Sequence, residues 1–214
     1  MSDRTRSPGG IQPTATTRRR CPPPYDPKLP WRALRWNGDG SPVRWDSTNP
    51  IRWAFNADAY PKPRQAQLVR EAMTMLAGTT GFVISETDPV VAEPDEWLRS
   101  SDVKAAEVLV SLANIDLQNH SGKAAGTAAA DAIELRPGVH VYRLADIRLR
   151  ASVLTLGVAL HEAMHALGLG HVGSRSEIMY WGGTAQAGFG RGDLAGLQAV
   201  SRPIEPPATS SPNR

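Results

Sequence analysis

Three of the five histidines in this chain fall within residues 161–171, which read HEAMHALGLGH. His161 and His165 are four residues apart, so on a helix their rings share one face and can bind one metal ion. A third ligand must come from another direction, and a sharp turn at Gly168 would bring His171 back to the ion. Three imidazoles without a nearby thiolate favour zinc, although affinity alone does not exclude copper, nickel or cobalt.

Glu162 follows the first of these histidines, where its carboxylate can face an open coordination position instead of binding the ion. A carboxylate in that place suits proton transfer during hydrolysis. The alternative is that His161, Glu162 and His165 form an ordinary solvated helix face. The apolar residues of 156–160 argue against it, because they leave little polar face and would bury the histidines without partners.

Hydrophobic periodicity predicts the strands and helices that must position this motif. Alternation over Ile51–Phe55 predicts a half-buried strand. Pro63 opens a helix whose apolar residues recur on one face, and Gly78 and Gly81 close it. Further strands are predicted at 82–84, 108–112, 133–135 and 139–142, the last two joined by a turn at 136–138; the Ala-rich residues 128–130 leave open where that pair begins.

Two helices follow these strands. Ser152 is predicted to cap a long helix that carries the motif and runs to Leu167, where Gly168 stops it. Asp193 is predicted to cap a last amphipathic helix. Strands and one helix first, then two helices, is an α+β pattern.

Length and composition fit one domain with loose ends. The chain has 214 residues, of which 41% are hydrophobic and 21% charged. We predict a disordered basic, proline-rich segment at 1–30 and a disordered proline-rich tail at 203–214, on either side of a folded domain at 31–202. The longest nearly apolar run, 151–160, is shorter than the roughly 20 residues of a membrane span. The formal charge of +3 resides largely in the tails, so we expect no nucleic-acid partner.

The motif with Gly168 in place resembles the metzincin clan of zinc endopeptidases. Met179, eight residues past His171, sits where that clan has its Met-turn methionine. Tyr180 directly after the methionine resembles the matrixin branch, the matrix-metalloproteinase-like peptidases. The order of elements over about 45–200 is also similar to that of matrixin catalytic domains.

The resemblance implies a fold and a reaction. The fold would be a zincin-like α+β catalytic domain: a mostly parallel twisted sheet with an antiparallel edge strand, an active-site helix and a C-terminal helix. The activity would be a zinc-dependent metalloendopeptidase in which the three histidines hold one zinc ion and Glu162 is the general base toward a zinc-activated water. Met179 would form an apolar floor under the histidines. A protein or peptide substrate would lie extended along an edge strand near 127–135.

The sequence also departs from the matrixin pattern. Trp181 and Gly182 stand where proline usually follows the tyrosine, so substrate preference is not carried over. Animal matrixins hold a second zinc ion and calcium ions; His120, Asp131 and His140 are the candidates here, and because their spacing does not match we expect neither ion. The family implies an enzyme that acts outside cells, although residues 1–30 contain no signal-peptide pattern. We expect a monomer.

Cys21 is the one cysteine in the chain and therefore cannot form an internal disulfide. In matrixin zymogens a cysteine just before the catalytic domain binds the zinc as a thiolate. The run Arg20, Cys21, Pro22, Pro23, Pro24, Tyr25 and Asp26 resembles that motif in its arginine, its cysteine, a proline and an aspartate, without the glycine and with the aspartate shifted. Cys21 is therefore either an inhibitory zinc latch or an ordinary free cysteine in a basic tail.

Two other functions compete with a peptidase. A zinc-stabilised binding module would keep the ion without turnover, but it would have no use for Glu162. Alternatively, the five arginines of 1–20 could recruit nucleic acid or an anionic surface, with a steep dependence on salt. Arginines in such a tail are more often solubilising.

Overall fold

The computed structural model describes residues 29–99, 105–113, 118–119, 122–183 and 186–204. Within them the helices are α1 (Pro63–Thr80), α2 (Pro94–Trp97), α3 (Leu156–Ala166) and α4 (Arg191–Val200), with short 3-10 turns at Ala57–Ala59 and Ala151–Val153. The strands are β1 (Arg44–Trp45), β2 (Ile51–Phe55), β3 (Ile84–Glu86), β4 (Val108–Ala113), β5 (Gln118–Asn119), β6 (Gly122–Lys123), β7 (Gly126–Arg136) and β8 (Val139–Arg150). Cys21, His120 and nearly all of the two predicted tails lie outside the described residues.

The sheet is mostly parallel. Its strands follow the order β1-β8-β4-β2-β3, and each neighbouring pair in that order is parallel. β7 pairs antiparallel with β8, from Gly126 opposite Leu149 to Arg136 opposite Val139, while β5 and β6 form a separate antiparallel pair. β7 has no second partner strand among the described residues. The predicted mostly parallel sheet with an antiparallel edge strand is therefore confirmed.

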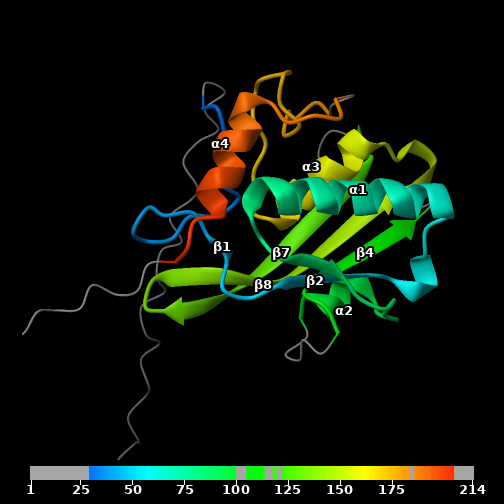
Figure 1. The fold of residues 1–214 in the computed structure, drawn as a ribbon, viewed down its shortest axis with the longest axis horizontal. Coiled ribbons are helices and arrows are strands. Elements are labelled where there is room, and N and C mark those ends of the chain that lie inside the picture. Colours follow the sequence, from blue (N-terminus) through cyan, green and yellow to red (C-terminus); the bar gives the residue numbers. More distant parts are fainter. Residues whose placement is uncertain (1–28, 100–104, 114–117, 120–121, 184–185, 205–214) are drawn as a thin grey trace, which may run out of the picture.

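The motif-bearing helix packs on the sheet through its own apolar face. Figure 1 shows α1 and α3 on one side of the sheet and the short α2 on the other. Ala145, Ile147 and Leu149 alternate along β8 and belong to the hydrophobic core, to which α3 contributes Leu160 and Met164. Burial of such side chains is the main favourable term in folding, at roughly 25 cal/mol per Å² of apolar surface. The position of α3 is thus fixed by its apolar residues, without any contribution from the three histidines.

The β7–β8 hairpin is longer than the sequence predicts. Strands were expected only at 133–135 and 139–142, but pairing continues down to Gly126 and up to Arg150. The alanines of 128–130 lie opposite 145–147, so small residues with no strand preference of their own are held by the ladder. The turn itself is where it was predicted, with Gly138 at φ +77°.

Three predicted boundaries are wrong. The strand expected at 82–84 begins at Ile84, because the chain must first leave the end of α1 at Gly81 (φ +75°) and bury Phe82. Ser152 does not cap the motif helix, since it lies in a 3-10 turn and the Thr155 hydroxyl accepts the Val158 N–H instead. Asp193 does not cap the last helix; α4 begins after Gly190, which places Asp193 at its third residue.

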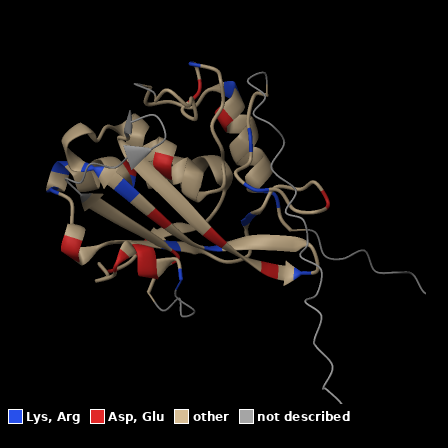
Figure 2. Ribbon diagram, turned by 180° about the vertical axis from the view of Figure 1, so that it is seen from behind, with Lys and Arg blue, Asp and Glu red and all other residues tan. Residues whose placement is uncertain are grey.

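Charged residues of both signs are spread over the described part of the chain. Lys and Arg alternate with Asp and Glu along the hairpin and the helices (Figure 2), so neither sign covers a whole element. Among the described residues, no helix combines the length and the apolar character that crossing a bilayer requires.

Candidate metal centre

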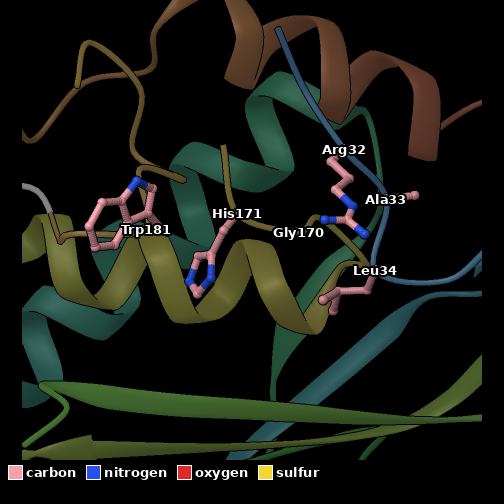
Figure 3. A pocket seen from close by; sticks show the side chains of 6 residues that line it. All are labelled: Arg32, Ala33, Leu34, Gly170, His171 and Trp181. Carbon is pink, nitrogen blue, oxygen red and sulfur yellow. The ribbon is translucent and has the colours of Figure 1, made fainter. Parts of the chain in front are cut away.

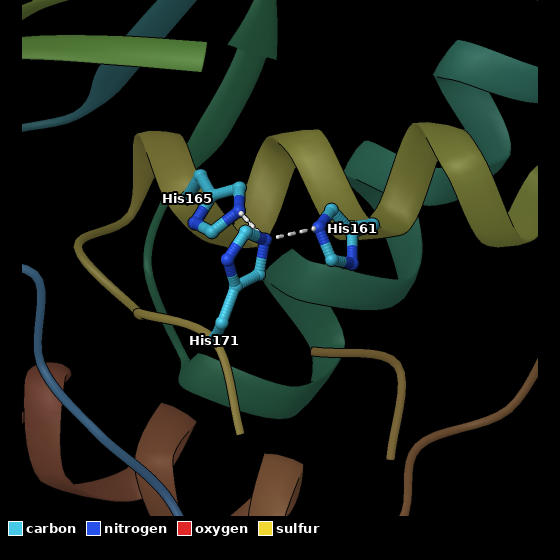
Figure 4. Close-up of side chains that lie close together, drawn as sticks. All are labelled: His161, His165 and His171. Atoms are coloured by element: carbon cyan, nitrogen blue, oxygen red, sulfur yellow. Dashed lines mark hydrogen bonds between the residues drawn. The ribbon is translucent and has the colours of Figure 1, made fainter. Parts of the chain in front are cut away.

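Three imidazole rings meet beside α3. His161 and His165 project from one face of the helix, and His171 approaches from the chain that follows it (Figure 4). The His171 Nε2 atom lies 3.1 Å from Nε2 of His161 and 3.0 Å from Nε2 of His165. In the part of the chain that the structure describes, this is the one group of three or more His, Cys, Asp or Glu side chains placed to hold a metal ion.

Backbone carbonyls fix how two of these rings are protonated. The Nδ1 atom of His161 lies 2.7 Å from the Ile178 carbonyl oxygen, and Nδ1 of His165 lies 2.7 Å from that of Leu169. A carbonyl only accepts, so each Nδ1 carries the proton and each Nε2 keeps its lone pair. His171 can donate at most one proton to this pair. At least one Nε2 lone pair therefore receives no hydrogen bond from the other two rings. One cation bound by all three Nε2 atoms would satisfy every lone pair.

The surroundings of the rings favour their neutral, ligand-competent form. Burial lowers the pKa of His161, and burial together with the charges of its two neighbours lowers the pKa of His165 well below its usual value. Burial and then His161 lower the pKa of His171 to about 4. Imidazoles that stay neutral at pH 7 bind a metal without first losing a proton.

Glu162 lies beside the cluster and is not one of its members. The side chain is buried, 6% exposed, so the reading of 161–165 as a solvated helix face is wrong. Its carboxyl packs against Gly126, the first residue of β7, where an added Cβ would lie 2.5 Å from the Glu162 Cγ. Burial raises the pKa of Glu162 to about 8, and a nearby positive charge would lower it again. The carboxyl thus has room only because position 126 carries no side chain.

A glycine corner returns the chain from α3 toward the rings. Gly168 has φ +103°, and an added Cβ would also lie 2.7 Å from the Tyr142 ring. The Trp45 Nε1–H donates to the Ala166 carbonyl at 2.9 Å, and the Leu169 N–H donates to that of Met164 at 3.0 Å. The last carbonyls of the helix are thereby satisfied as the chain turns out of it.

The segment that carries His171 is held by backbone bonds on both sides. Before it, the Gly170 N–H donates to the Arg32 carbonyl at 2.7 Å. After it, the Val172 N–H donates to the Met179 carbonyl at 2.8 Å, and the Trp181 N–H donates to the Val172 carbonyl at 3.2 Å. His171 is exposed at the surface, yet its backbone is tied down at two points.

Asp193 of α4, which the sequence predicts as a helix cap, supports the candidate metal centre. Asp193 accepts the N–H groups of Ile178 at 2.6 Å, Met179 at 3.2 Å and Gly190 at 2.9 Å. Since the Ile178 carbonyl orients His161, Asp193 acts on the ring through this short loop. The spacing of residues could not predict this role, because the groups that donate to the Asp193 carboxylate are backbone N–H groups.

The remaining candidates lie in different surroundings. Met179 is 1% exposed and directly follows Ile178, and Tyr180 is half-buried with its ring under the Arg175 guanidinium, 5.8 Å away. Asp131 of β7 pairs with Arg143 at 2.7 Å. His140 lies in β8 opposite Glu134, far along the sheet from the rings.

Comparison with known sequences gives no match, whereas comparison with solved structures gives distant likenesses. No protein-family model matches this sequence, and no curated protein sequence matches it. A solved structure to which the chain is similar is metalloproteinase-II from Bacteroides fragilis, with 16% sequence identity and a TM-score of 0.37. The match covers 83% of this chain and 55% of that one, so the chain spans about half the length of the Bacteroides protein.

Proposed function

We propose that this protein is a zinc-dependent metalloendopeptidase. The observation that carries the proposal is the meeting of three imidazole Nε2 atoms at one point, with carbonyls behind two rings directing their lone pairs inward. Three neutral nitrogen ligands without a fourth protein donor are the set typical of a catalytic zinc ion. When bound there, zinc would act as a Lewis acid and lower the pKa of water to about 7.

Glu162 is the residue that would move the proton. It follows His161 on α3, its carboxyl packs against the start of β7, and it is not one of the three grouped ligands. In that place it can accept the proton of the attacking water and later donate it to the departing amine. No covalent bond to the protein is needed in this reaction.

The substrate would bind as an extended peptide along β7. This strand pairs with β8 on one edge, and its first residue touches Glu162. Backbone groups on a free strand edge can add a strand of substrate, which would bring a peptide bond to the general base. The predicted binding edge at 127–135 falls within β7.

Within this class we propose a matrixin-like metzincin. The support is the position of Met179, buried next to the loop residue that orients His161, and of Tyr180 after it. Gly168 at the corner of the extended histidine motif is consistent with that assignment.

Glu162→Gln tests the function with little change of shape. The variant should bind one zinc ion per chain, as the parent does, because the carboxyl is not a ligand. Cleavage of casein or of a quenched peptide should fall by about 10²- to 10⁴-fold, the usual contribution of a general base. The measurements are metal content by atomic absorption and initial rates of cleavage.

The matched control is Glu71→Gln, which changes an exposed glutamate on α1 and should leave both readings at the parent value. Undiminished cleavage by Glu162→Gln would remove Glu162 from the mechanism. If the parent itself binds zinc at one ion per chain but cleaves nothing, the protein is the zinc-stabilised binding module instead.

A further inference from the structure

The strand that adjoins Glu162 carries exposed apolar side chains at its other end. β7 begins at Gly126, against the Glu162 carboxyl, and its 11 residues end at the turn of the hairpin. Figure 1 shows this hairpin of β7 and β8 reaching beyond α1 and α3. At about 3.3 Å per residue, Ile133 lies about 23 Å from Gly126 along the strand, and Leu135 lies about 30 Å from it.

Ile133 and Leu135 form an apolar patch on this strand. Their side chains are 46% and 52% exposed, and among the described residues no other exposed large apolar side chain belongs to a strand. β7 pairs with β8 along one edge, and the described part of the chain supplies no strand for its other edge. A polypeptide that lies along this edge would cover both side chains.

A strand added to the edge of β7 would extend a row of apolar side chains across the sheet. Ile133 lies opposite Val141 of β8, which is 6% exposed, so these two side chains share one face of the sheet. The added strand would supply the next member of the row, and an apolar side chain there would pack against Ile133. Leu135 lies where the register shifts between Glu134 and Arg136, so it would offer a side-chain contact beyond the regular pairing.

The charged groups of β7 do not oppose such a contact. Asp131 pairs with Arg143 at 2.7 Å, and Oε1 of Glu134 accepts the Gly138 N–H at 2.8 Å. β7 contains neither lysine nor proline, which natural proteins place on edge strands to prevent pairing with other chains. The composition of this strand therefore suits pairing with a second polypeptide.

A pocket of about 500 Å³ opens at the opposite end of this path, beside the candidate metal centre. It is lined by Arg32, Ala33, Leu34, Gly170, His171 and Trp181, none of which belongs to β7. Figure 3 shows His171 between Trp181 and the segment that carries Ala33 and Leu34. Because His171 also belongs to the ring cluster, every peptide that spans the cluster lies beside this pocket. Only a longer chain would also reach Ile133.

We propose that Ile133 and Leu135 are a second substrate contact, which selects extended polypeptides with apolar side chains about seven to nine residues from the cleaved bond. The preferred substrate is therefore a protein segment long enough to lie along all of β7, rather than a short peptide. This inference rests on the proposed peptidase function. The direction in which the substrate runs along β7 determines on which side of the cleaved bond the apolar residues stand.

The test uses quenched peptides that share one cleavable core and carry an extension of about ten residues on one side of it or on the other. At the positions that would reach the patch, the extension has either leucines or glutamines. On one of the two sides, the parent should show a KM about tenfold lower for the leucine peptide with little change in kcat, because this contact is far from the reacting bond.

The double variant Ile133→Thr/Leu135→Thr should bring the ratio of the two KM values close to one. Threonine retains the preference for strand while it removes apolar surface. Val83→Thr/Val91→Thr is the matched control, because these valines are 66% and 70% exposed and lie before and after β3, at another edge of the sheet. The control should keep the parent ratio, and thermal unfolding should show that all variants are folded.

A parent without a leucine preference on either side, or a variant at 133 and 135 that keeps it, would overturn the second contact while leaving the peptidase function standing. Size-exclusion chromatography adds a further check. A parent dimer that the double variant converts to a monomer would also overturn the proposal, since a second copy of the chain would then occupy the strand edge. Failure of the parent to cleave any peptide of the set would instead overturn the peptidase function, and this inference with it.

Discussion

At the scale of single residues, the geometry of the candidate metal centre depends on backbone carbonyls and on a glycine, which have no reactive side chain. The Ile178 and Leu169 carbonyls decide which nitrogen of His161 and His165 would face a bound ion. Such carbonyl partners raise the basicity of metal-bound imidazoles and fix their orientation. The arrangement of the rings and of Glu162 is thus set by backbone atoms and by Gly126, where a side chain would intrude on the Glu162 carboxyl.

Gly126→Ala should lower the proposed peptidase activity without touching a ligand. The new Cβ would lie 2.5 Å from the Glu162 Cγ and 2.8 Å from its Oε1, so the carboxyl must move. A displacement of about 1 Å in a catalytic group can cost on the order of 10²-fold in rate. We expect kcat to fall by about that factor while zinc content stays at the parent value.

Gly78→Ala provides the control for this change. Gly78 lies inside α1 with nothing within 4 Å of an added Cβ, so that variant should be fully active. If Gly126→Ala cleaved peptides at the parent rate, the contact between β7 and Glu162 would have no bearing on catalysis.

Spacing along the chain predicts the ligand trio but not its support. His161, His165 and the corner at Gly168 follow from the helical period and from the need for positive φ. The role of Gly126 could not be predicted in the same way, because this residue acts through a contact with Glu162, which is more than 30 positions away. Local patterns contain no information about such pairings until the sheet and its register are known.

At the scale of elements, α4 holds the loop at Ile178 and Met179, and this loop orients His161 of α3. Asp193 binds the loop through three backbone N–H groups, and the Asp193 N–H donates to Glu177 Oε2 at 2.9 Å. The sequence pattern predicts this helix correctly; of its expected apolar face, Leu197 and Val200 are buried but Leu194 is 45% exposed. It placed the helix start wrongly because an aspartate at the third position accepts N–H groups much as a capping residue does.

Asp193→Ala should loosen the metal centre from a distance. Without the carboxylate, the Ile178 and Met179 N–H groups are left buried and unpaired, at roughly 1–3 kcal/mol each. We expect lower stability and a zinc affinity reduced by about 10- to 100-fold, the usual effect of losing indirect support of a ligand. Asp193→Asn retains one acceptor oxygen and should fall between the parent and the alanine variant.

Zinc affinity measured by competition with a chelator, together with urea unfolding, separates these effects. Asp88→Ala removes an exposed aspartate and should change neither quantity. Parent-like zinc affinity in Asp193→Ala would mean that the loop holds its shape without α4.

At the scale of the whole molecule, a buried carboxyl on the far side of the sheet makes stability depend on pH. Asp146 of β8 is 3% exposed, and its Oδ2 accepts from the Arg148 Nε at 2.6 Å. Arg148 also pairs with Asp95 of α2. Burial raises the pKa of Asp146 from 3.8 to about 6 against the opposing effect of Arg148.

Asp146→Asn should remove a pH-dependent cost of folding. Between about pH 4 and pH 6 the native chain holds this proton while the unfolded chain has lost it, so the contribution of Asp146 to stability falls as pH rises. The asparagine keeps an acceptor for Arg148 but has no charge to bury. The gain in unfolding free energy of the variant over the parent should therefore grow through this range and level off above it. Urea unfolding at half-unit steps of pH measures the gain, and a constant difference would exclude Asp146 as its source.

The N-terminal segment carries Cys21, whose effect on cleavage can be measured only on the whole chain. Cys21 lies outside the described residues, eleven positions before Arg32, and a chain of that length can span up to about 40 Å. Since Arg32 borders the pocket beside His171, a Cys21 thiolate is within reach of the open face of the ion, where it would block water and substrate. We propose that Cys21→Ser raises basal cleavage several-fold.

An alkylating reagent should activate the parent in the same way and leave the variant unchanged, because only the parent has a thiol to release. Equal activity of the two proteins, with or without the reagent, would identify Cys21 as an ordinary free cysteine.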